Sequence, residues 1–323
     1  MTNVLLVAER DDRGEMSQST LQAVTAARGL SDPVVTVAIA GDLPPSASAL
    51  PVSRVVAVSP VDSADAGIYD QLTADLAGLV SSGSPEVVIL GKTDLGSVVG
   101  ARLAFRADGA FASDCVEVSN AAGAISVTRP VYGGSALAEF EIASLPAVVT
   151  LRGGAFEPAG IGEAAGLPAP EIDTFTPGQP AVRSAAVTDT VAESREGVRL
   201  EDADVVVSGG RGLGGPEPFA VLTDVANALG GAVGASRAAC DAGWIDHSHQ
   251  VGLTGKSVSP DVYIAVGISG ASQHMAGCSS SRAIVAINKD GDSNIFKEAR
   301  FGVVGDWEKI LPSFLATVRD LKA

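Results

Sequence analysis

Short apolar runs alternate with amphipathic segments along the first third of the chain. The apolar, β-branched runs predict buried strands at 3–8, 33–40, 54–59 and 86–91. Between these runs, apolar residues recur at helical spacing and predict helices at 17–30, 69–80 and 95–106. Strands that alternate with helices imply an α/β fold with a mostly parallel sheet covered by helices.

The pattern changes in the middle of the chain. Runs at 115–119, 124–131 and 137–143 predict short antiparallel strands, and a further apolar strand is predicted at 147–151. Five prolines between residues 153 and 182 stand among glycine, alanine and acidic residues, which indicates a connector without regular elements. The short, polar segment 184–198 predicts a last strand and a hinge, so we place a domain boundary near residue 192.

A second series of elements begins after this boundary. The pattern predicts strands at 203–207, 262–266, 283–287 and 301–304, and helices at 217–229 and 307–321. Their number and spacing are typical of one nucleotide-binding domain. The chain is therefore predicted to form two α/β domains, 1–192 and 193–323.

Composition and charge exclude several classes of function. The net charge is −16, and the sequence lacks the basic stripe that a nucleic acid or an anionic membrane surface requires. No apolar run reaches the ~18 residues of a membrane span, and the first residues resemble neither a signal peptide nor an import leader. Cys115, Cys240 and Cys278 stand too far apart to suggest a disulfide framework or a metal motif. We expect a cytoplasmic protein.

A glycine-rich string lies between a predicted strand and a predicted helix. Gly210-Arg211-Gly212-Leu213-Gly214-Gly215 matches the spacing G-x-G-x-x-G, which in dinucleotide sites is followed by an acidic residue after the next strand. Here Arg237 stands in that region and the acid is missing. A pyridine-nucleotide enzyme is therefore disfavoured, and failure to bind NAD would dismiss it. A tight strand-to-helix turn explains the glycines equally well.

Other strings place polar groups at predicted strand ends. Ser236 and Arg237 offer a hydroxyl and a planar cation, which suit a flavin or a phosphate, although a helix-capping serine and a surface arginine explain them too. The string 250–256 ends in Gly-Lys like a P-loop, but the P-loop spacing fails, so kinase or ATPase chemistry is unsupported. It still offers backbone N–H groups and the Thr254 hydroxyl.

Two strings follow predicted strands in the second domain. Residues 267–274 combine two glycines with Ser269, Gln273 and His274 at a carboxyl strand end, where open α/β sheets bind ligands. A lone histidine is more often structural, but this context favours function. Asn288 follows the next strand and suits a ribose or a ribityl chain, or simply a turn. The His-x-His pair at 247–249 has no third ligand nearby, so we predict no metal.

Together, these strings resemble the FAD domain of electron transfer flavoprotein alpha subunits, the FixB family. The matching strings stand in the family's order at 207–212, 234–239, 250–256, 264–274 and 286–290. The first half of the chain matches only in its alternation of elements, its length and its first strand. The resemblance implies a Rossmann-like FAD-binding domain at 193–323, behind an N-terminal α/β domain.

The resemblance implies an electron carrier rather than an enzyme with a small-molecule substrate of its own. One FAD would be bound non-covalently, and a smaller beta subunit, carrying AMP, would pack against the first domain to form a heterodimer. Electrons would come from flavin dehydrogenases, such as the acyl-CoA dehydrogenases of fatty acid beta-oxidation. They would pass to a membrane quinone oxidoreductase. The FAD domain would swing on the hinge near residue 192.

The resemblance also implies positions along the cofactor. Arg211 would follow the phosphate–adenosine portion, and Ser236 and Arg237 would flank the isoalloxazine and the pyrophosphate. Thr254 would lie near N5, and His274 near the C2 carbonyl, with Asn288 and Asp306 at the adenosine end. The implied cofactor-binding set is Arg211, Ser236, Arg237, Gln250, Val251, Gly252, Leu253, Thr254, Ser269, Gly270, Ala271, Ser272, Gln273, His274, Asn288 and Asp306.

Three of these residues would tune the flavin. A cation or a hydrogen-bond donor near N1 and the C2 carbonyl, such as Arg237 or His274, stabilises negatively charged reduced forms, and the Thr254 hydroxyl would act at N5. The sequence departs from the family at Leu253, where glutamine is usual, and at Ser272, where a larger apolar residue is common. Both departures bear on the flavin potential.

Two further functions stay open at this point. In an electron-bifurcating flavoprotein the beta subunit holds a second FAD, which the partner's sequence would decide. A non-redox adenine-nucleotide-binding module would also fit the α/β pattern of the first half, and it would give a colourless purified complex.

Overall fold

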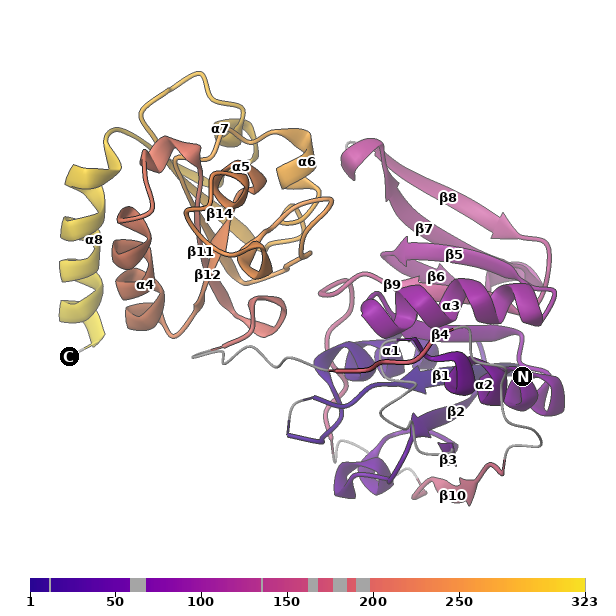
Figure 1. Cartoon of the computed structure of the whole chain (residues 1–323). Coiled ribbons are helices and arrows are strands. Elements are labelled where there is room, and N and C mark those ends of the chain that lie inside the picture. The colour runs from indigo at the N-terminus through magenta and orange to yellow at the C-terminus, as the bar shows by residue number, and fades with distance from the viewer. Residues whose placement is uncertain are drawn as a thin grey trace. The chain divides into compact units, whose positions relative to one another are not determined.

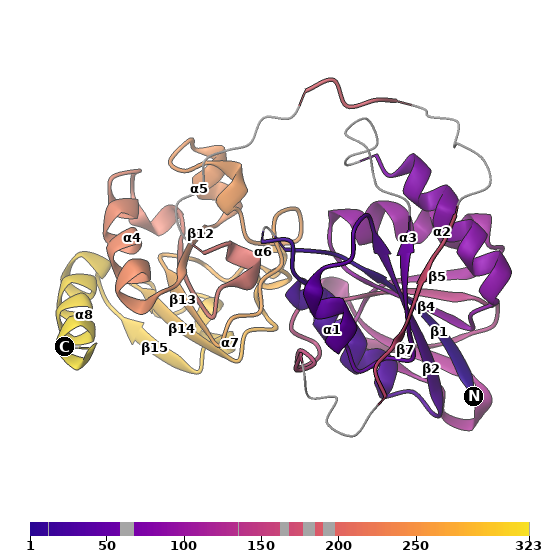
Figure 2. The same ribbon diagram turned by 90° about the horizontal axis from the view of Figure 1, so that it is seen from below.

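The computed structural model describes residues 1–11, 13–58, 68–134, 136–161, 168–176, 185–189 and 198–322. The contacts divide the chain into two compact units, Met1–Pro130 with Leu137–Ala192, and Val131–Ala136 with Glu193–Ala323. Each unit is an α/β body (Figures 1 and 2). The predicted hinge near residue 192 lies outside the described residues, as does most of the predicted strand at 184–198.

The first unit is built on a seven-stranded sheet in the order β10-β3-β2-β1-β4-β9-β5, with parallel pairing between neighbours. Its strands are β1 (Thr2–Ala8), β2 (Pro33–Ala40), β3 (Arg54–Val58), β4 (Val87–Gly91), β5 (Ala110–Cys115), β9 (Ala147–Leu151) and β10 (Glu171–Thr174). Its helices are α1 (Gln18–Arg28), α2 (Asp70–Gly83) and α3 (Asp94–Arg106).

Strand β1 shows why this sheet is covered on both faces. Val4 and Leu6 belong to one core with α1, whereas Leu5 and Val7 belong to a second core with α2 and α3. Successive side chains point to opposite faces of a strand, so an apolar run without polar interruption requires a cover on each side. The predicted covered, mostly parallel sheet is confirmed.

The middle of the chain forms a separate three-stranded sheet, β6-β7-β8, with bounds β6 (Glu117–Ser119), β7 (Ile125–Val131) and β8 (Ala136–Ile142). β6 and β7 pair antiparallel, as the sequence predicts. One strand was not predicted, and another contradicts the sequence prediction. β5 belongs to the large parallel sheet, and β10 interrupts the connector predicted at 153–182. β10 is exposed along its length and lies at a sheet edge, where strands need no apolar pattern.

The second unit holds a five-stranded sheet in the order β12-β11-β13-β14-β15, again with parallel neighbours. Its strands are β11 (Val205–Gly209), β12 (Ala232–Ala235), β13 (Val262–Val266), β14 (Ala283–Asn288) and β15 (Phe301–Val304). Its helices are α4 (Pro218–Leu229), α5 (Arg237–Asp241), α6 (Ser272–Met275), α7 (Ile295–Glu298) and α8 (Trp307–Lys322). The predicted α/β fold is confirmed here too.

Helices cover both faces of this second sheet. Leu222 of α4 and Leu311 of α8 share one core, and Met275 of α6 and Ile295 of α7 share the other (Figure 1). In chain order the strands lie 2-1-3-4-5, so the winding reverses between β11 and β13. A doubly wound sheet opens a crevice at the carboxyl ends of the strands at that point.

Candidate functional site

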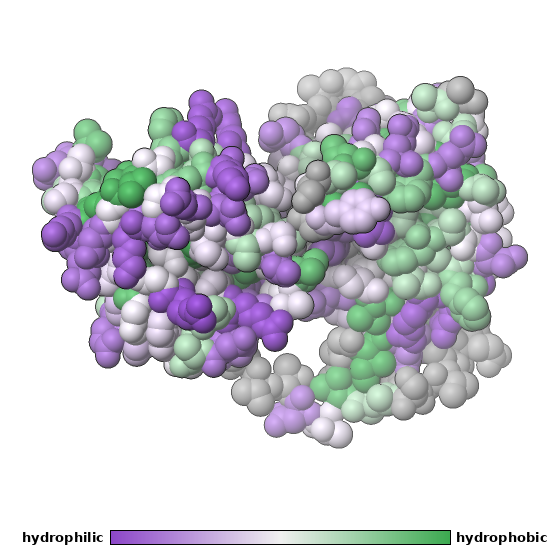
Figure 3. All heavy atoms as spheres, turned by 90° about the horizontal axis from the view of Figure 1, so that it is seen from above, coloured by the Kyte–Doolittle hydropathy of each residue, from purple (hydrophilic) through white to green (hydrophobic). Residues whose placement is uncertain are grey.

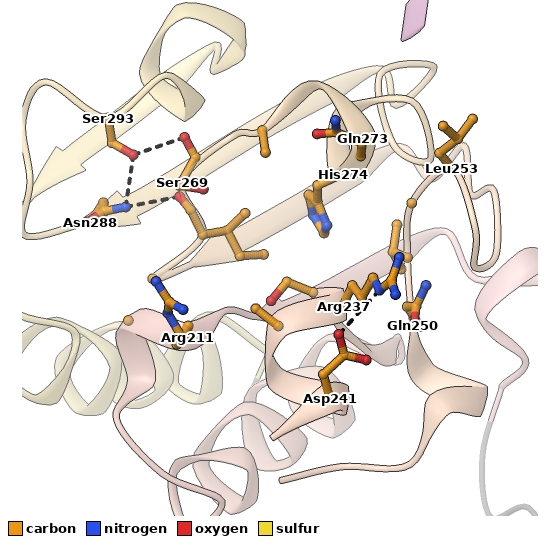
Figure 4. A pocket seen from close by; sticks show the side chains of 18 of the residues that line it. Arg211, Arg237, Asp241, Gln250, Leu253, Ser269, Gln273, His274, Asn288 and Ser293 are labelled. Carbon is orange, nitrogen blue, oxygen red and sulfur yellow. Dashed lines mark hydrogen bonds and ion pairs between the residues drawn. The ribbon is translucent and has the colours of Figure 1, made fainter. Parts of the chain in front are cut away.

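A cavity of about 730 Å³ lies at the carboxyl ends of β11 and β13 (Figure 4). This volume falls in the range of cofactor pockets. The lining residues are Arg211, Gly212, Ser236, Arg237, Ala238, Asp241, Gln250, Val251, Gly252, Leu253, Thr254, Gly267, Ile268, Ser269, Ala271, Gln273, His274, Asn288, Asp290 and Ser293.

Two glycine loops meet backbone to backbone at the cavity. The Gly212 amide donates a hydrogen bond to the Gly267 carbonyl at 2.9 Å, and a Cβ added to Gly212 would lie 2.8 Å from the Gly267 Cα. Gly267 itself has a φ of +63°, which L side chains rarely adopt. The glycine string at 210–215 therefore allows the loops after β11 and β13 to touch.

The loop after β13 is held by the loop after β14. The Asn288 amide donates to the Ile268 carbonyl at 2.9 Å, and the Ser293 hydroxyl donates to the Ser269 carbonyl at 3.1 Å. The Asn288 amide also lies 3.3 Å from the Ser293 hydroxyl (Figure 4). The structure thus shows Asn288 as a clamp on the neighbouring loop, and its predicted contact with adenosine stays a prediction.

Arg237 begins α5 and pairs with Asp241 one turn later, with Nε 3.2 Å from Oδ2. Both side chains are more than half exposed, so this ion pair adds less than about 1 kcal/mol to stability. Its effect is local, because it keeps the guanidinium at the cavity wall. Figure 4 places Arg237 between Arg211 at one end of the cavity and Leu253 at the other.

Ser236 precedes α5 without capping it. Its hydroxyl oxygen is buried and has no hydrogen-bond partner within the described part of the chain. The helix-capping role considered for Ser236 is therefore not what the structure shows. A buried polar atom without a partner costs about 1–3 kcal/mol, so a ligand that supplied one would be stabilised.

The loop at 250–254 is ordered by its own side chains and by α6. The Gln250 amide donates to the Thr254 hydroxyl at 3.0 Å, and its carbonyl oxygen lies 3.1 Å from Nδ1 of His247. The Leu253 amide donates to the Gln273 carbonyl at 2.7 Å. Leu253 is 65% exposed, so an apolar side chain stands at the cavity where the family resemblance implies glutamine.

His274 lies in α6 with only 7% of its surface exposed. Its Nε2 is 2.9 Å from the Tyr263 hydroxyl, whereas its Nδ1 has no hydrogen-bond partner among the residues that the structure describes. Burial lowers the pKa of His274 to about 4, against an opposing effect of the Val251 backbone. The imidazole is therefore neutral at neutral pH and carries a single N–H.

The structure brings most of the predicted site residues together. Gly270, Ser272 and Asp306 do not occur among the described residues that line the cavity. Asp306 precedes α8, and its carboxylate accepts the Glu308 amide at 3.1 Å. Its predicted role at adenosine stays a prediction.

Several lining residues are absent from the predicted set, namely Gly212, Ala238, Asp241, Gly267, Ile268, Asp290 and Ser293. Most of them stand inside the strings that led to the prediction. Asp241 lies four residues after Arg237 in α5, a short helix that the sequence analysis did not predict. Ser293 belongs to no string, and no signal in the sequence marks it.

Two family models match the chain. The model described as "Electron transfer flavoprotein domain" matches residues 4–175, and the model described as "Electron transfer flavoprotein FAD-binding domain" matches residues 199–279. The electron transfer flavoprotein subunit alpha of Mycobacterium leprae is 38% identical over the whole of both chains. The Paracoccus denitrificans subunit alpha is 39% identical over 96% of this chain and 97% of its own, and that of Bacillus subtilis is 36% identical over 96% and 95%.

The chain belongs to the electron transfer flavoprotein alpha-subunit family. This membership confirms the resemblance found in the sequence and supports a role in electron transfer. The FAD-binding match covers the loops after β11, β12 and β13, whereas Asn288, Asp290 and Ser293 lie beyond its end.

The cavity of this family member fits a flavin dinucleotide. Ser236 Oγ and His274 Nδ1 are buried, and in the described residues neither finds a hydrogen-bond partner. Gly212 and Gly267 allow the two loops to meet, so that main-chain atoms form this part of the cavity wall. Two guanidinium groups, from Arg211 and Arg237, suit the two phosphates of a dinucleotide.

Proposed function

We propose that this chain is the alpha subunit of a heterodimeric electron transfer flavoprotein that binds one FAD non-covalently in the cavity of its second unit. The observation that carries the proposal is the pair of buried polar atoms, Ser236 Oγ and His274 Nδ1, without partners among the described residues. Ser236 and His274 both line the cavity at the reversal of the strand order. A flavin dinucleotide has acceptors and donors that would complete both.

Each part of the cavity has a separate task in this proposal. Arg211 holds the anionic diphosphate, Arg237 lies between the diphosphate and the ring system, and the backbone of the glycine loops approaches the diphosphate closely. The Thr254 hydroxyl and the neutral His274 imidazole donate hydrogen bonds to the ring system, and the buried Val251 and Ile268 exclude water. FAD, when bound, supplies reversible redox chemistry, so the chain needs no substrate pocket of its own.

The beta subunit would pack on the first unit. Apolar side chains gather over that unit in the view of Figure 3, while hydrophilic ones dominate the second. The exposed large apolar residues of α3, β5, β8 and the turn after β8 are Phe105, Phe111, Leu137, Phe140 and Leu145. Exposed large apolar side chains of this kind support a protein partner on the first unit. The beta subunit would carry AMP.

The redox partners follow from the same proposal. Flavin dehydrogenases, such as the acyl-CoA dehydrogenases of fatty acid beta-oxidation, would donate electrons, and a membrane quinone oxidoreductase would accept them. In the described residues, none of the helices has the length and apolar character that a membrane crossing needs. A cytoplasmic location stays a prediction of the sequence, as does the swing of the FAD domain near residue 192.

The test is an absorbance spectrum of the chain purified with its beta subunit, recorded during stepwise reduction. A yellow complex that takes up electrons in two separate one-electron steps supports the proposal. His274→Ala and Arg237→Ala should reduce the difference between the potentials of the two one-electron steps. A colourless complex that FAD does not reconstitute would overturn the proposal.

A further inference from the structure

Behind the cavity wall, a buried tyrosine contacts the histidine that lines the cavity. Tyr263 lies on β13 with none of its surface exposed, and its hydroxyl oxygen is 2.9 Å from Nε2 of His274. The two ring centroids are 6.0 Å apart and the planes are tilted by 56°. The two residues therefore meet through their polar atoms and not by stacking.

The surroundings of Tyr263 decide which group donates. Burial raises the pKa of Tyr263 well above its ordinary value, and the Cys278 thiol adds to this effect, so the phenol keeps its proton. Ser208 lies beside the phenol without a hydrogen bond of good geometry, and its hydroxyl lowers the pKa of Tyr263, which is the effect of a nearby donor. Nε2 of His274, 2.9 Å away, is the acceptor that lies in reach of the phenol proton in the described hydrogen bonds.

We propose that Tyr263 is a positioning residue whose hydroxyl donates to Nε2 of His274 and thereby holds the imidazole in the tautomer with its proton on Nδ1. A neutral imidazole has one donor nitrogen and one acceptor nitrogen, so the partner of one nitrogen fixes the role of the other. The proposal rests on the proposed function only for the identity of the ligand.

The tautomer determines what the cavity wall offers. Nδ1 is the imidazole nitrogen left for a ligand, since across the described ranges it is buried without a hydrogen bond of good geometry. The Val251 backbone raises the pKa of His274, which is the effect of an acceptor near the ring. As an N–H it donates to a carbonyl oxygen or another acceptor on the ligand. As a lone pair it would repel the same acceptor. Tyr263 does not line the cavity, but through His274 it determines whether this contact with the ligand is attractive or repulsive.

Tyr263 also fills volume in the core that it shares with Met275 and Ile295. Tyr263→Phe separates the two roles, because phenylalanine keeps the ring in the core and removes only the hydroxyl. Tyr69→Phe is the matched control, because it removes a phenol hydroxyl in the first unit. Unfolding curves of both variants show whether the fold is retained.

The experiment uses the full-length chain with ¹⁵N-labelled histidine, alone and with an unlabelled beta subunit. The chain has three histidines, so loss of one pair of ring resonances in His274→Ala assigns His274. Long-range ¹H–¹⁵N spectra at neutral pH distinguish protonated from unprotonated ring nitrogens. We expect one dominant form with the proton on Nδ1, and a ratio of tautomers that changes by about fivefold to tenfold in Tyr263→Phe.

A second readout measures the dissociation constant of FAD. Tyr263→Phe should weaken FAD by about fivefold to tenfold, and in a His274→Gln background the same substitution should change nothing, because Tyr263 acts through His274. A proton on Nε2 in the unmodified chain, or an unchanged tautomer ratio in Tyr263→Phe, overturns the inference. Failure of FAD to bind overturns the proposed function instead, and it leaves the tautomer measurement valid.

Discussion

The side-chain amide of Gln250 donates a hydrogen bond to the hydroxyl of Thr254 at 3.0 Å. Gln250 is buried, whereas Thr254 is exposed at the cavity, so the bond joins the interior of the unit to its ligand-facing surface. A hydroxyl whose oxygen already accepts a hydrogen bond is left with its proton to donate. Gln250 therefore directs the Thr254 proton away from itself and toward the cavity.

This relationship predicts that Gln250 and Thr254 act as a unit in binding FAD. Gln250→Ala and Thr254→Val should each weaken FAD by about tenfold, and the double variant should be little worse than either. Isothermal titration of the flavin-free chain measures the three dissociation constants. Gln250→Ala combined with Ser293→Ala is the control, because Ser293 holds the loop after β13 and does not contact Gln250. Additive effects of Gln250→Ala and Thr254→Val would show that these two residues act independently.

The ion pair of Arg237 and Asp241 predicts a gain of affinity on removal of the carboxylate. Asp241→Asn leaves the guanidinium without its counter-charge at the cavity wall, so FAD should bind about threefold to tenfold more tightly at low salt. Asp261→Asn removes the same charge from an exposed pair outside the cavity and should leave affinity unchanged. Equal effects of the two variants would show that only the net charge of the chain matters.

Gly270 and Gly230 predict two different costs for the same substitution. Both have a positive φ, +77° and +74°, but a Cβ on Gly270 would lie 2.3 Å from the Ile295 amide nitrogen, whereas the space at Gly230 is open. Gly230→Ala should lower the free energy of unfolding by about 1 kcal/mol, and Gly270→Ala by about 3 kcal/mol or more. Tryptophan fluorescence during urea unfolding reports on this unit, because Trp244 and Trp307 both belong to it. Equal losses of unfolding free energy in the two variants would show that the contact with Ile295 adds no cost at Gly270.

The sequence predicts the central strands of the second unit because they are buried on both faces, but it does not predict the short helices α5, α6 and α7. An apolar run such as 262–266 has no other stable place in a soluble domain. It does not predict which loops meet, because strand order depends on contacts between distant segments. Asn288 illustrates the limit. Its position after a strand suited either a sugar contact or a turn, and only the folded chain shows its amide on the Ile268 carbonyl.

The first unit shows the same limit at its edges. β5 contains Asp114, whose φ of +63° accompanies a register shift, so no period of two runs through the strand. Arg152 binds the Asp114 carboxylate from the neighbouring strand's end. Contacts of this kind stabilise a strand that its own hydrophobic pattern does not predict.

His274 predicts a pH dependence of stability in the flavin-free chain. The pKa of His274 in the folded chain is about 4, below the ordinary value of 6.5. Between these two pH values the imidazole is therefore protonated in the unfolded chain but not in the folded chain. Stability should fall as pH decreases from 6.5 to about 4, by about 3 kcal/mol in total, and this effect levels off below pH 4. Urea unfolding at a series of pH values measures it.

The matched variants for this prediction are His274→Gln and His247→Gln. The first removes the buried imidazole and should flatten the decline between pH 6.5 and 4. The second removes an exposed imidazole and should keep it. A decline of equal steepness in both would assign the pH dependence to other groups.

The contact between Gly212 and Gly267 has a consequence for divergence within the family. A surface made of main-chain atoms does not change when neighbouring side chains are substituted. A Cβ at Gly212 or Gly267 would collide with the other loop, so no other residue type fits at these two positions. Substitutions on the opposite rim meet no such steric limit, because Arg237, Leu253 and Thr254 present side chains to the cavity.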